Sequence, residues 1–337
     1  MAQRPTMNDV AAQAGVSQAV VSLVLSGAHA GRASAATAQR VRDAATTLGY
    51  RTNLQAKSLK TGVAEIIGLV GDEVATSPFS GMMIKGAQDR AWRDGHTLLT
   101  IDTGGDSELE SAAVETMLSH QVRGIIYTAM YHREVTVPAP ALDTRVVCLN
   151  ARDLDGQVPS VTPDEVTGGY EATRVLLDAG HTRIAMINIH DVLPAARGRR
   201  EGYERALAES GLAADPDLVY KGEGTQRSGF EAARHLMGLP VPPTAIFCGN
   251  DRTALGVYQG LAEIGLRVPD DVSIVGYDDQ DILRDFFHPG LTTVQLPFAE
   301  MGDRAAALVL DADAPVQTHL IHCPVIHRHS VAPPKGQ

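Results

Sequence analysis

The stretch Thr6–Gly27, TMNDVAAQAGVSQAVVSLVLSG, predicts two short helices joined by a tight turn. Thr6 can cap the first helix, because its side-chain oxygen can accept hydrogen bonds from free backbone N–H groups, and Gly15 is expected to end it. Ser17 can cap a second helix over residues 18–25. This spacing is typical of a helix-turn-helix, whose second helix can enter a DNA major groove.

The apolar residues of both helices fall on one face, which predicts a small shared core. A third helix can begin after Ser34, carry Val41, Ala45 and Leu48 on one face, and end at Gly49. Many pairs of short helices never contact nucleic acid. The third helix favours the DNA-binding interpretation, because it would give the pair a core of its own. At or near the outer face of the second helix we expect Gln18, Ala19, Ser22 and Leu23.

A longer set of residues extends this pattern: Asp9-Val10-Ala11, Ala14-Gly15-Val16-Ser17, Val21-Ser22, Val41, Leu48-Gly49-Tyr50 and residues 53–60. With this set the chain resembles the lac-repressor (LacI/GalR) family of bacterial transcription regulators. The resemblance implies an α/β protein with a three-helix head, a hinge helix and a two-lobed, periplasmic-binding-protein-like body of two doubly wound parallel sheets. It also implies that the head contacts DNA through Thr6, Ser17, Gln18, Ala19, Ser22 and Leu23.

Residues 53–62 link the head to the body. Asn53 can cap a helix that ends near Lys60, and so short a helix is marginal alone in water. In the family this segment orders on DNA, and a leucine at the position of Leu59 wedges between base pairs in the minor groove. The resemblance therefore implies DNA contacts from Asn53, Ala56, Lys57 and Leu59; packing of Leu59 against the body is the alternative.

Positive charge is concentrated in the predicted head. Residues 1–62 hold seven basic and two acidic residues, a net charge of +5, whereas the rest holds 22 basic and 38 acidic residues, a net charge of −16. A basic head on an acidic body favours contact of the head with phosphates, although a chance surface imbalance could give the same numbers.

The composition places the chain among globular proteins. Of its 337 residues 44% are hydrophobic, no run of about 18 apolar residues occurs, and the N-terminus has no apolar signal core. We expect a cytoplasmic, nucleoid-associated protein without a membrane partner. Cys148, Cys248 and Cys323 are expected to be buried free thiols, and no spacing of ligands indicates a metal or another cofactor.

From Glu65 onward, short apolar runs alternate with helix-length segments. Runs of four to six apolar residues predict strands covered on both faces, hence parallel sheets with helices on both sides. About 270 residues is long for one such sheet, so two sheets with a cleft between them are expected. The strand candidates are residues 66–70, 97–101, 124–128, 146–149, 184–187, 245–248 and 272–276.

The resemblance gives the division of the chain. It implies a DNA-binding domain over residues 1–52, a hinge and linker over 53–62, and an effector-binding and dimerisation domain over 63–337. The first lobe of that domain is expected at about 63–161 and 291–321, and the second at about 162–290 and 322–337. A chain that crosses between lobes more than once makes a hinge, so a ligand in the cleft can alter the angle between the lobes.

Small molecules bind beyond the carboxyl ends of parallel strands, and polar residues follow several predicted strands here. Asn250 and Asp278 stand at such ends, and the guanidinium of Arg199 can fork across two adjacent oxygens. Phe79 could lay its ring on the apolar face of a sugar. The resemblance implies that Phe79, Arg199, Asn250 and Asp278 line the cleft; turns, helix caps and local packing are the alternatives. Asn150 and Asp102 are weaker candidates.

These observations predict an effector-responsive transcription regulator, foremost a repressor, that binds a palindromic operator in double-stranded DNA as a homodimer. The expected effector is a small polar molecule, with a carbohydrate favoured and a purine left open. Because Ala19 and Leu23 offer only apolar contacts, no operator sequence can be carried over from the family. The alternatives are a cytoplasmic solute-binding protein or sensor with the same body, and an enzyme of doubly wound fold. The enzyme is disfavoured because the sequence has no Gly-rich phosphate loop after its first strand, no Gly-flanked Ser nucleophile and no paired His ligands.

Overall fold

The computed structural model describes residues 5–26, 32–50, 63–77 and 80–335. These residues form two compact units, one within residues 1–64 and one over 65–337, and each is described by itself. No helix among the described residues is long and apolar enough to cross a membrane.

The first unit is a bundle of α1 (Met7–Ala14), α2 (Gln18–Leu25) and α3 (Ala35–Leu48). The predicted caps are confirmed: Thr6, Ser17 and Ser34 each accept a hydrogen bond from a backbone N–H of the first turn. Gly15 ends α1 with a φ of 65°, a left-handed conformation that glycine adopts without strain. The core buries apolar residues from all three helices: Val10, Ala11, Ala14, Val21, Val24, Ala38, Val41, Ala44 and Ala45.

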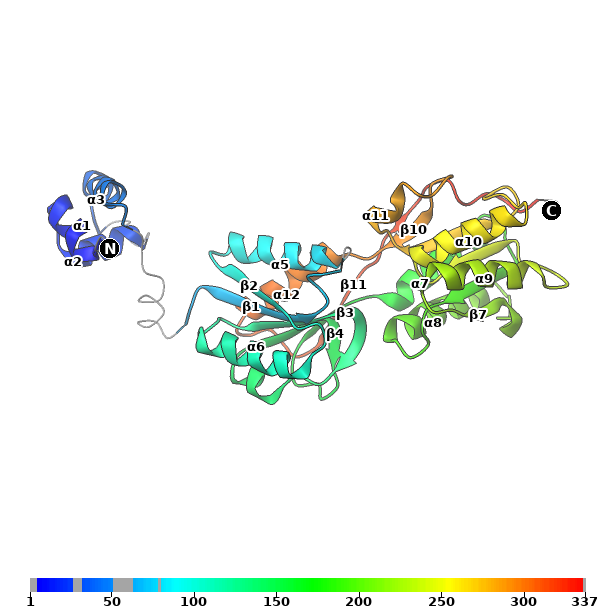
Figure 1. Ribbon diagram of the computed structural model, residues 1–337, viewed down its shortest axis with the longest axis horizontal. Coiled ribbons are helices and arrows are strands. Elements are labelled where there is room, and N and C mark those ends of the chain that lie inside the picture. The colour runs from blue at the N-terminus through cyan, green and yellow to red at the C-terminus, as the bar shows by residue number, and fades with distance from the viewer. Residues whose placement is uncertain (1–4, 27–31, 51–62, 78–79, 336–337) are drawn as a thin grey trace. The chain divides into compact units, whose positions relative to one another are not determined.

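The second unit has two six-stranded sheets. The first sheet has the strand order β11-β5-β4-β3-β1-β2. Its strands are β1 (Ile66–Asp72), β2 (Thr97–Asp102), β3 (Ile125–Val135), β4 (Val146–Asp153), β5 (Ser160–Pro163) and β11 (Thr318–Ile321). All its pairs are parallel. Helices α5 (Gly81–Arg93) and α12 (Phe298–Leu310) cover one face and α6 (Ser107–Ser119) covers the other (Figure 1). A 3₁₀ turn, η1 (Ala139–Asp143), precedes β4.

The second sheet has the strand order β12-β10-β9-β8-β6-β7. Its strands are β6 (Ile184–Asn188), β7 (Val219–Lys221), β8 (Ala245–Cys248), β9 (Ser273–Asp278), β10 (Thr292–Gln295) and β12 (Val325–Ile326). Helices α7 (Glu165–Asp178) and α8 (Pro194–Glu209) pack on one face, and α9 (Gln226–Met237) and α10 (Asp251–Glu263) on the other. The short elements η2 (Pro216–Leu218) and α11 (Asp281–Arg284) complete this lobe. The two doubly wound sheets confirm the predicted fold class, with one antiparallel pair, β10–β12.

The sheet pairing corrects the expected lobe boundaries. The expected boundaries place residues 292–295 in the first lobe, but β10 pairs with β9 and β12 in the second sheet. Likewise, β5 continues to Pro163 in the first sheet, two residues beyond the expected boundary. Each strand joins the sheet in which its backbone N–H and C=O groups find hydrogen-bond partners. The chain therefore crosses between the lobes at 163–165, 295–298 and 321–325.

Strand β3 is longer than the predicted 124–128 and is irregular. Its register with β4 shifts between Thr128 and Arg133. The side-chain amide of Asn150, on β4, donates to the carbonyls of Ala129 and Met130 at 3.1 and 2.9 Å, so the carbonyls left by the irregularity are satisfied. Residues 131–135 therefore continue past the predicted end of the strand. The three cysteines are buried and free, as predicted.

Candidate functional site

The outer face of α2 carries the predicted DNA-reading residues. Gln18, Ala19 and Ser22 are exposed, whereas Leu23 is half-buried. Thr6 and Ser17 are also exposed, but both act as helix caps, and Thr6 forms a reciprocal capping box with Asp9. The predicted hinge residues lie outside the described residues: Asn53, Ala56, Lys57 and Leu59.

A narrow cleft lies between the two lobes of the second unit. It brings together three predicted residues, Arg199, Asn250 and Asp278, with the weaker candidate Asn150. The complete lining is Met130, Tyr131, His132, Asn150, Glu165, Ile189, Leu193, Ala195, Arg199, Asn250, Arg252, Asp278, Leu296 and Phe298. Phe79 lies outside the described residues.

Asp102 does not line this cleft. Its carboxylate accepts hydrogen bonds from the backbone N–H groups of Glu73, Ala75 and Gly104 at 2.8–3.0 Å. It therefore orders the loop after β1. The proposal of Asp102 as a cleft residue was wrong, because the strand-end rule does not separate side chains that face a cleft from those that bond a neighbouring loop.

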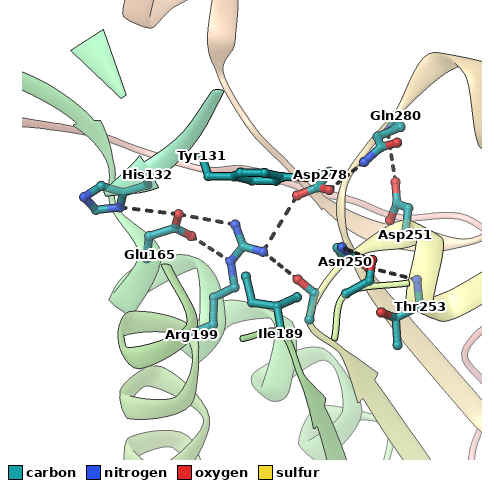
Figure 2. A network of polar contacts seen from close by, with 12 residues as sticks. Tyr131, His132, Glu165, Ile189, Arg199, Asn250, Asp251, Thr253, Asp278 and Gln280 are labelled. Carbon is teal, nitrogen blue, oxygen red and sulfur yellow. Dashed lines mark hydrogen bonds and ion pairs between the residues drawn. The ribbon is translucent and has the colours of Figure 1, made fainter. Parts of the chain in front are cut away.

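The centre of the cleft wall is an ion pair between Arg199 and Glu165 (Figure 2). Nε of Arg199 donates to one carboxylate oxygen of Glu165 at 2.8 Å, and Nη2 donates to the other at 3.2 Å. Nη1 donates to the carbonyl of Gly249 at 2.5 Å and lies 3.8 Å from the carboxylate of Asp278. The guanidinium also stacks on the ring of Tyr277, 3.8 Å from its centre.

Both members of this ion pair are buried. Only 4% of each side chain is exposed. Burial disfavours the charged form of Glu165, but the charge and hydrogen bonds of Arg199, with the nearby imidazole of His132, outweigh it, and the pKa of Glu165 falls to about 2. Burial likewise disfavours the charged form of Arg199, but the charges of Glu165 and Asp278 raise its pKa. Both groups are therefore ionised at neutral pH.

Glycines allow the two helices that carry this pair to approach closely. A Cβ on Gly202 of α8 would collide with the backbone of Val166, and one on Gly169 of α7 would lie 2.7 Å from Cα of Arg199. A Cβ on Gly198 would lie 2.7 Å from Cβ of Glu165. Because no side chain separates the helices at these points, the carboxylate and the guanidinium reach each other while remaining buried.

Two further carboxylates lie beside the pair. Asp278 ends β9 with a φ of 112°, a strained backbone conformation, and its carboxylate accepts from the side chain of Gln280 at 2.7 Å. Asp251 accepts from Thr293 and from the backbone N–H of Gln280, at 2.7 and 2.9 Å. Burial raises the pKa of both, and the charge of Asp278 raises that of Asp251 further. Protons are therefore held more tightly here than on exposed carboxyls.

Asn250 is largely engaged in structure. Its side-chain oxygen accepts from the N–H of Thr253 at 2.8 Å, so it caps α10, and its amide donates to the carbonyl of Gly224 at 3.0 Å. Asn250 therefore lines the cleft and also fixes the loop beside it.

The extension of β3 brings the first lobe to the second. Nδ1 of His132 lies 3.7 Å from the carboxylate of Glu165, and the Tyr131 hydroxyl accepts from Arg252 at 3.3 Å. The two lobes of the second unit are therefore in direct contact through polar side chains that line the cleft.

Sequence reasoning missed several residues of this lining. Glu165 lies two residues after the end of β5 and satisfies the same strand-end rule that found Asp278, so the rule could have found it. Tyr131 and His132 were missed because the strand was predicted to end at Thr128. Phe298 is the first residue of α12 and follows a crossing between the lobes. It was missed because the expected boundary placed that crossing elsewhere.

A helix-turn-helix unit joined in one chain to a two-lobed unit with a polar cleft defines the class of ligand-responsive DNA-binding regulators. Comparison with known proteins agrees with this class. Residues 6–53 match the family "Bacterial regulatory proteins, lacI family", and residues 64–328 match "Periplasmic binding proteins and sugar binding domain of LacI family". The chain belongs to the LacI family of bacterial regulatory proteins.

Individual relatives cover almost the whole chain. The HTH-type transcriptional regulator GalR of Escherichia coli (strain K12) is 33% identical over 98% of this chain and 96% of its own length. The lac repressor dimer bound to operator and the anti-inducer ONPF is 26% identical with a TM-score of 0.79, covering 98% of this chain and 100% of that one. The complex of transcriptional regulator CelR with cellobiose is 28% identical with a TM-score of 0.68, covering 97% and 100%.

Proposed function

We propose that this protein is an effector-responsive transcriptional repressor that binds a palindromic operator as a homodimer, with a carbohydrate in the cleft between its lobes altering operator affinity. The observation that carries the proposal is the cleft itself, in which Arg199, Glu165 and Asp278 form a buried polar wall, in a chain that also has a helix-turn-helix. A two-fold protein requires two-fold half-sites, hence the palindrome.

The relatives support the choice of effector and assembly. CelR is seen with cellobiose, and the lac repressor is seen as a dimer on its operator. In the present cleft, Phe298, Leu296 and Ile189 supply apolar surface beside the polar wall. A sugar presents both kinds of surface, because its ring carries C–H faces and its hydroxyls lie at the edge.

On the DNA side, we assign base reading to the exposed face of α2. Gln18 can bond an adenine edge, and Ala19 and Leu23 can meet thymine methyl groups. Thr6, Ser17 and Ser22 complete the DNA-facing set of the head. Asn53, Ala56, Lys57 and Leu59 are proposed to contact the minor groove, on the strength of their match to the family's hinge segment.

The effector acts by differential affinity. A ligand shifts operator binding only if it binds one arrangement of the lobes better than the other. His132 and Tyr131 reach from the first lobe to the second, so we assign them to the coupling. We infer that the ligand is returned unaltered, without catalysis, and that the protein acts in the cytoplasm, associated with the nucleoid.

The deciding experiment is a melting-temperature screen against neutral sugars, sugar phosphates and nucleobases, followed by an operator titration with each ligand that stabilises the protein. A ligand at about 100 times its dissociation constant adds roughly 2.7 kcal/mol to the unfolding free energy. A stabilising sugar that changes operator affinity supports the proposal. A ligand that binds without any effect on operator affinity would favour the solute-binding alternative, and release of a chemically altered ligand would favour the enzyme.

The DNA assignment has its own test. Gln18→Ala should weaken binding to the operator, whereas Gln39→Ala, at an exposed position on α3, should not.

Leu59→Ala should reduce operator affinity far more than affinity for random DNA. Equal losses on both DNAs would show that Leu59 is no wedge.

A further inference from the structure

The cations of the cleft already have counter-charges within the protein. Glu165 occupies the fork of Arg199 through both carboxylate oxygens, at 2.8 and 3.2 Å. Asp278 lies 3.8 Å from the same guanidinium, and the charge of Arg252 also acts on Asp278. Among the described lining residues, Arg199 and Arg252 therefore face Glu165 and Asp278, two charges of each sign.

The guanidinium of Arg199 cannot readily reorient toward a ligand. Arg199 is held on one side by Glu165, on another by the carbonyl of Gly249 at 2.5 Å, and on its face by Tyr277. Anion recognition by arginine uses two parallel N–H bonds from this fork. Because these donors already meet a carboxylate, a ligand's phosphate or carboxylate would have to displace Glu165, leaving that side chain charged and buried.

An anion in the cleft would also meet repulsion. Glu165 and Asp278 flank the guanidinium that would attract it (Figure 2). A hydroxyl group faces no such penalty, because it can donate to carboxylate oxygens and accept from N–H groups without carrying charge. Asn150, on the opposite wall, is a neutral amide.

We propose that the effector is an uncharged, hydroxyl-rich carbohydrate, and that Glu165 is the specificity residue that excludes phosphorylated and carboxylated sugars by occupying the fork of Arg199. This inference rests on the proposed function, since it names the chemical class of ligand for the same cleft. It also gives Glu165 a role in ligand selection, through its charge and its position against Arg199.

The test uses matched pairs of ligands on the full-length protein. Galactose, glucose and cellobiose are titrated by calorimetry, together with galactose 1-phosphate, glucose 6-phosphate, cellobiose 6′-phosphate, galacturonate and glucuronate. At least one neutral sugar should bind, with each charged counterpart of that sugar weaker on the order of 1,000-fold, as expected for like charges about 4 Å apart at an effective dielectric constant of about 20.

The outcomes separate the two hypotheses. Equal or tighter binding of a phosphate or a uronate overturns the exclusion by Glu165 and leaves the carbohydrate effector standing. Binding of no sugar of either kind, by a protein that still binds its operator, overturns the carbohydrate effector and this inference with it.

A variant isolates the residue responsible. Glu165→Gln keeps the shape of the side chain and removes its charge, so the ratio of neutral to charged affinity should fall by at least about tenfold. The matched control is Glu201→Gln, an exposed acid on α8, which should leave the ratio unchanged. Parallel loss of all ligands in Glu165→Gln would indicate a purely structural role and would contradict the proposal. Because the wild-type ligand pairs need no variant, the proposal stays testable if Glu165→Gln fails to fold.

Discussion

The two walls of the cleft differ in kind. Among the lining residues described, the wall from the first lobe consists of neutral, aromatic and imidazole groups, including Tyr131, His132 and Asn150, whereas the wall from the second lobe carries the acids and arginines. The charged wall is built within one lobe by two helices in close contact, so its geometry does not depend on closure. The neutral wall is positioned by an irregular strand and reaches the other lobe through the side chains of Tyr131 and His132. Effector affinity can therefore depend mainly on the charged wall, and the response to the effector on the neutral wall.

The comparison predicts that the largest loss follows removal of charge from the second wall. Arg199→Leu leaves Glu165 ionised and buried without its partner, so the free energy of unfolding should fall by about 3–5 kcal/mol. Urea denaturation measures this loss. Arg200→Leu, the neighbouring position with a largely exposed partner in Glu204, should lose less than about 1 kcal/mol. Similar losses in the two variants would remove the distinction between the buried pair and ordinary surface pairs.

The next effect concerns the helix contact beneath that wall. Gly202→Ala places a methyl group against the backbone of Val166, so α7 and α8 must separate at an expected loss of about 1–3 kcal/mol. A Cβ on Gly81 of α5 would meet no atom of the described residues within 4 Å, so Gly81→Ala should change stability by less than about 0.5 kcal/mol. If Gly202→Ala were equally neutral, close packing would not be what fixes the charged wall.

A smaller effect should appear as pH dependence. The pKa of Asp251 is raised above 3.8 by burial and by the charge of Asp278, so the folded state binds its proton more tightly than the unfolded state does. Stability therefore falls as pH rises from about 4 toward the raised pKa. Asp251→Asn should flatten the decline in melting temperature between pH 5 and 9.

The control for this pH effect is Asp271, whose pKa is lowered by hydrogen bonds from Lys335 and from the backbone of Arg267. Its contribution to stability is present above the ordinary Asp value and is lost only as pH falls below it. Asp271→Asn should therefore leave the slope between pH 5 and 9 unchanged. An unchanged slope in Asp251→Asn as well would mean that this aspartate is ionised in the folded protein throughout that range.

The smallest effect is expected on the neutral wall. Tyr131→Phe removes the hydroxyl that accepts from Arg252 across the lobes, and the Tyr131 side chain is 41% exposed. Unfolding free energy should change by less than about 0.5 kcal/mol, while effector affinity falls by about threefold or less. Calorimetry with the bound sugar checks this, and a loss as large as that of Arg199→Leu would reverse the order of the two walls.

Much of the fold was predictable because its signals are local. Helix caps at Thr6, Ser17 and Ser34, and buried apolar runs, identify elements without knowledge of their neighbours. The lobe boundary failed at β10, because the sheet that a short strand joins is decided by pairing partners far away in sequence. The same limit applies to the cleft.

The strand-end rule found Asn250 and Asp278, but it could not predict that Arg199 is paired within the protein. That pairing depends on the approach of α7 to α8. The extended part of β3, which brings Tyr131 and His132 to the cleft, depends on a register shift supported by Asn150. In both cases the decisive contacts join residues that no local pattern links.

The crossings between lobes bear on the order in which the molecule is made. Strand β11 forms an edge of the first sheet and β12 an edge of the second, and both lie beyond residue 317. Although domains commonly fold as units during synthesis, starting with the N-terminal one, neither lobe can complete its sheet until these late segments have left the ribosome. The three-helix head has no such dependence, because its described core residues lie no later than residue 50. A nascent chain can thus carry a finished helix-turn-helix while its sensory body is still open.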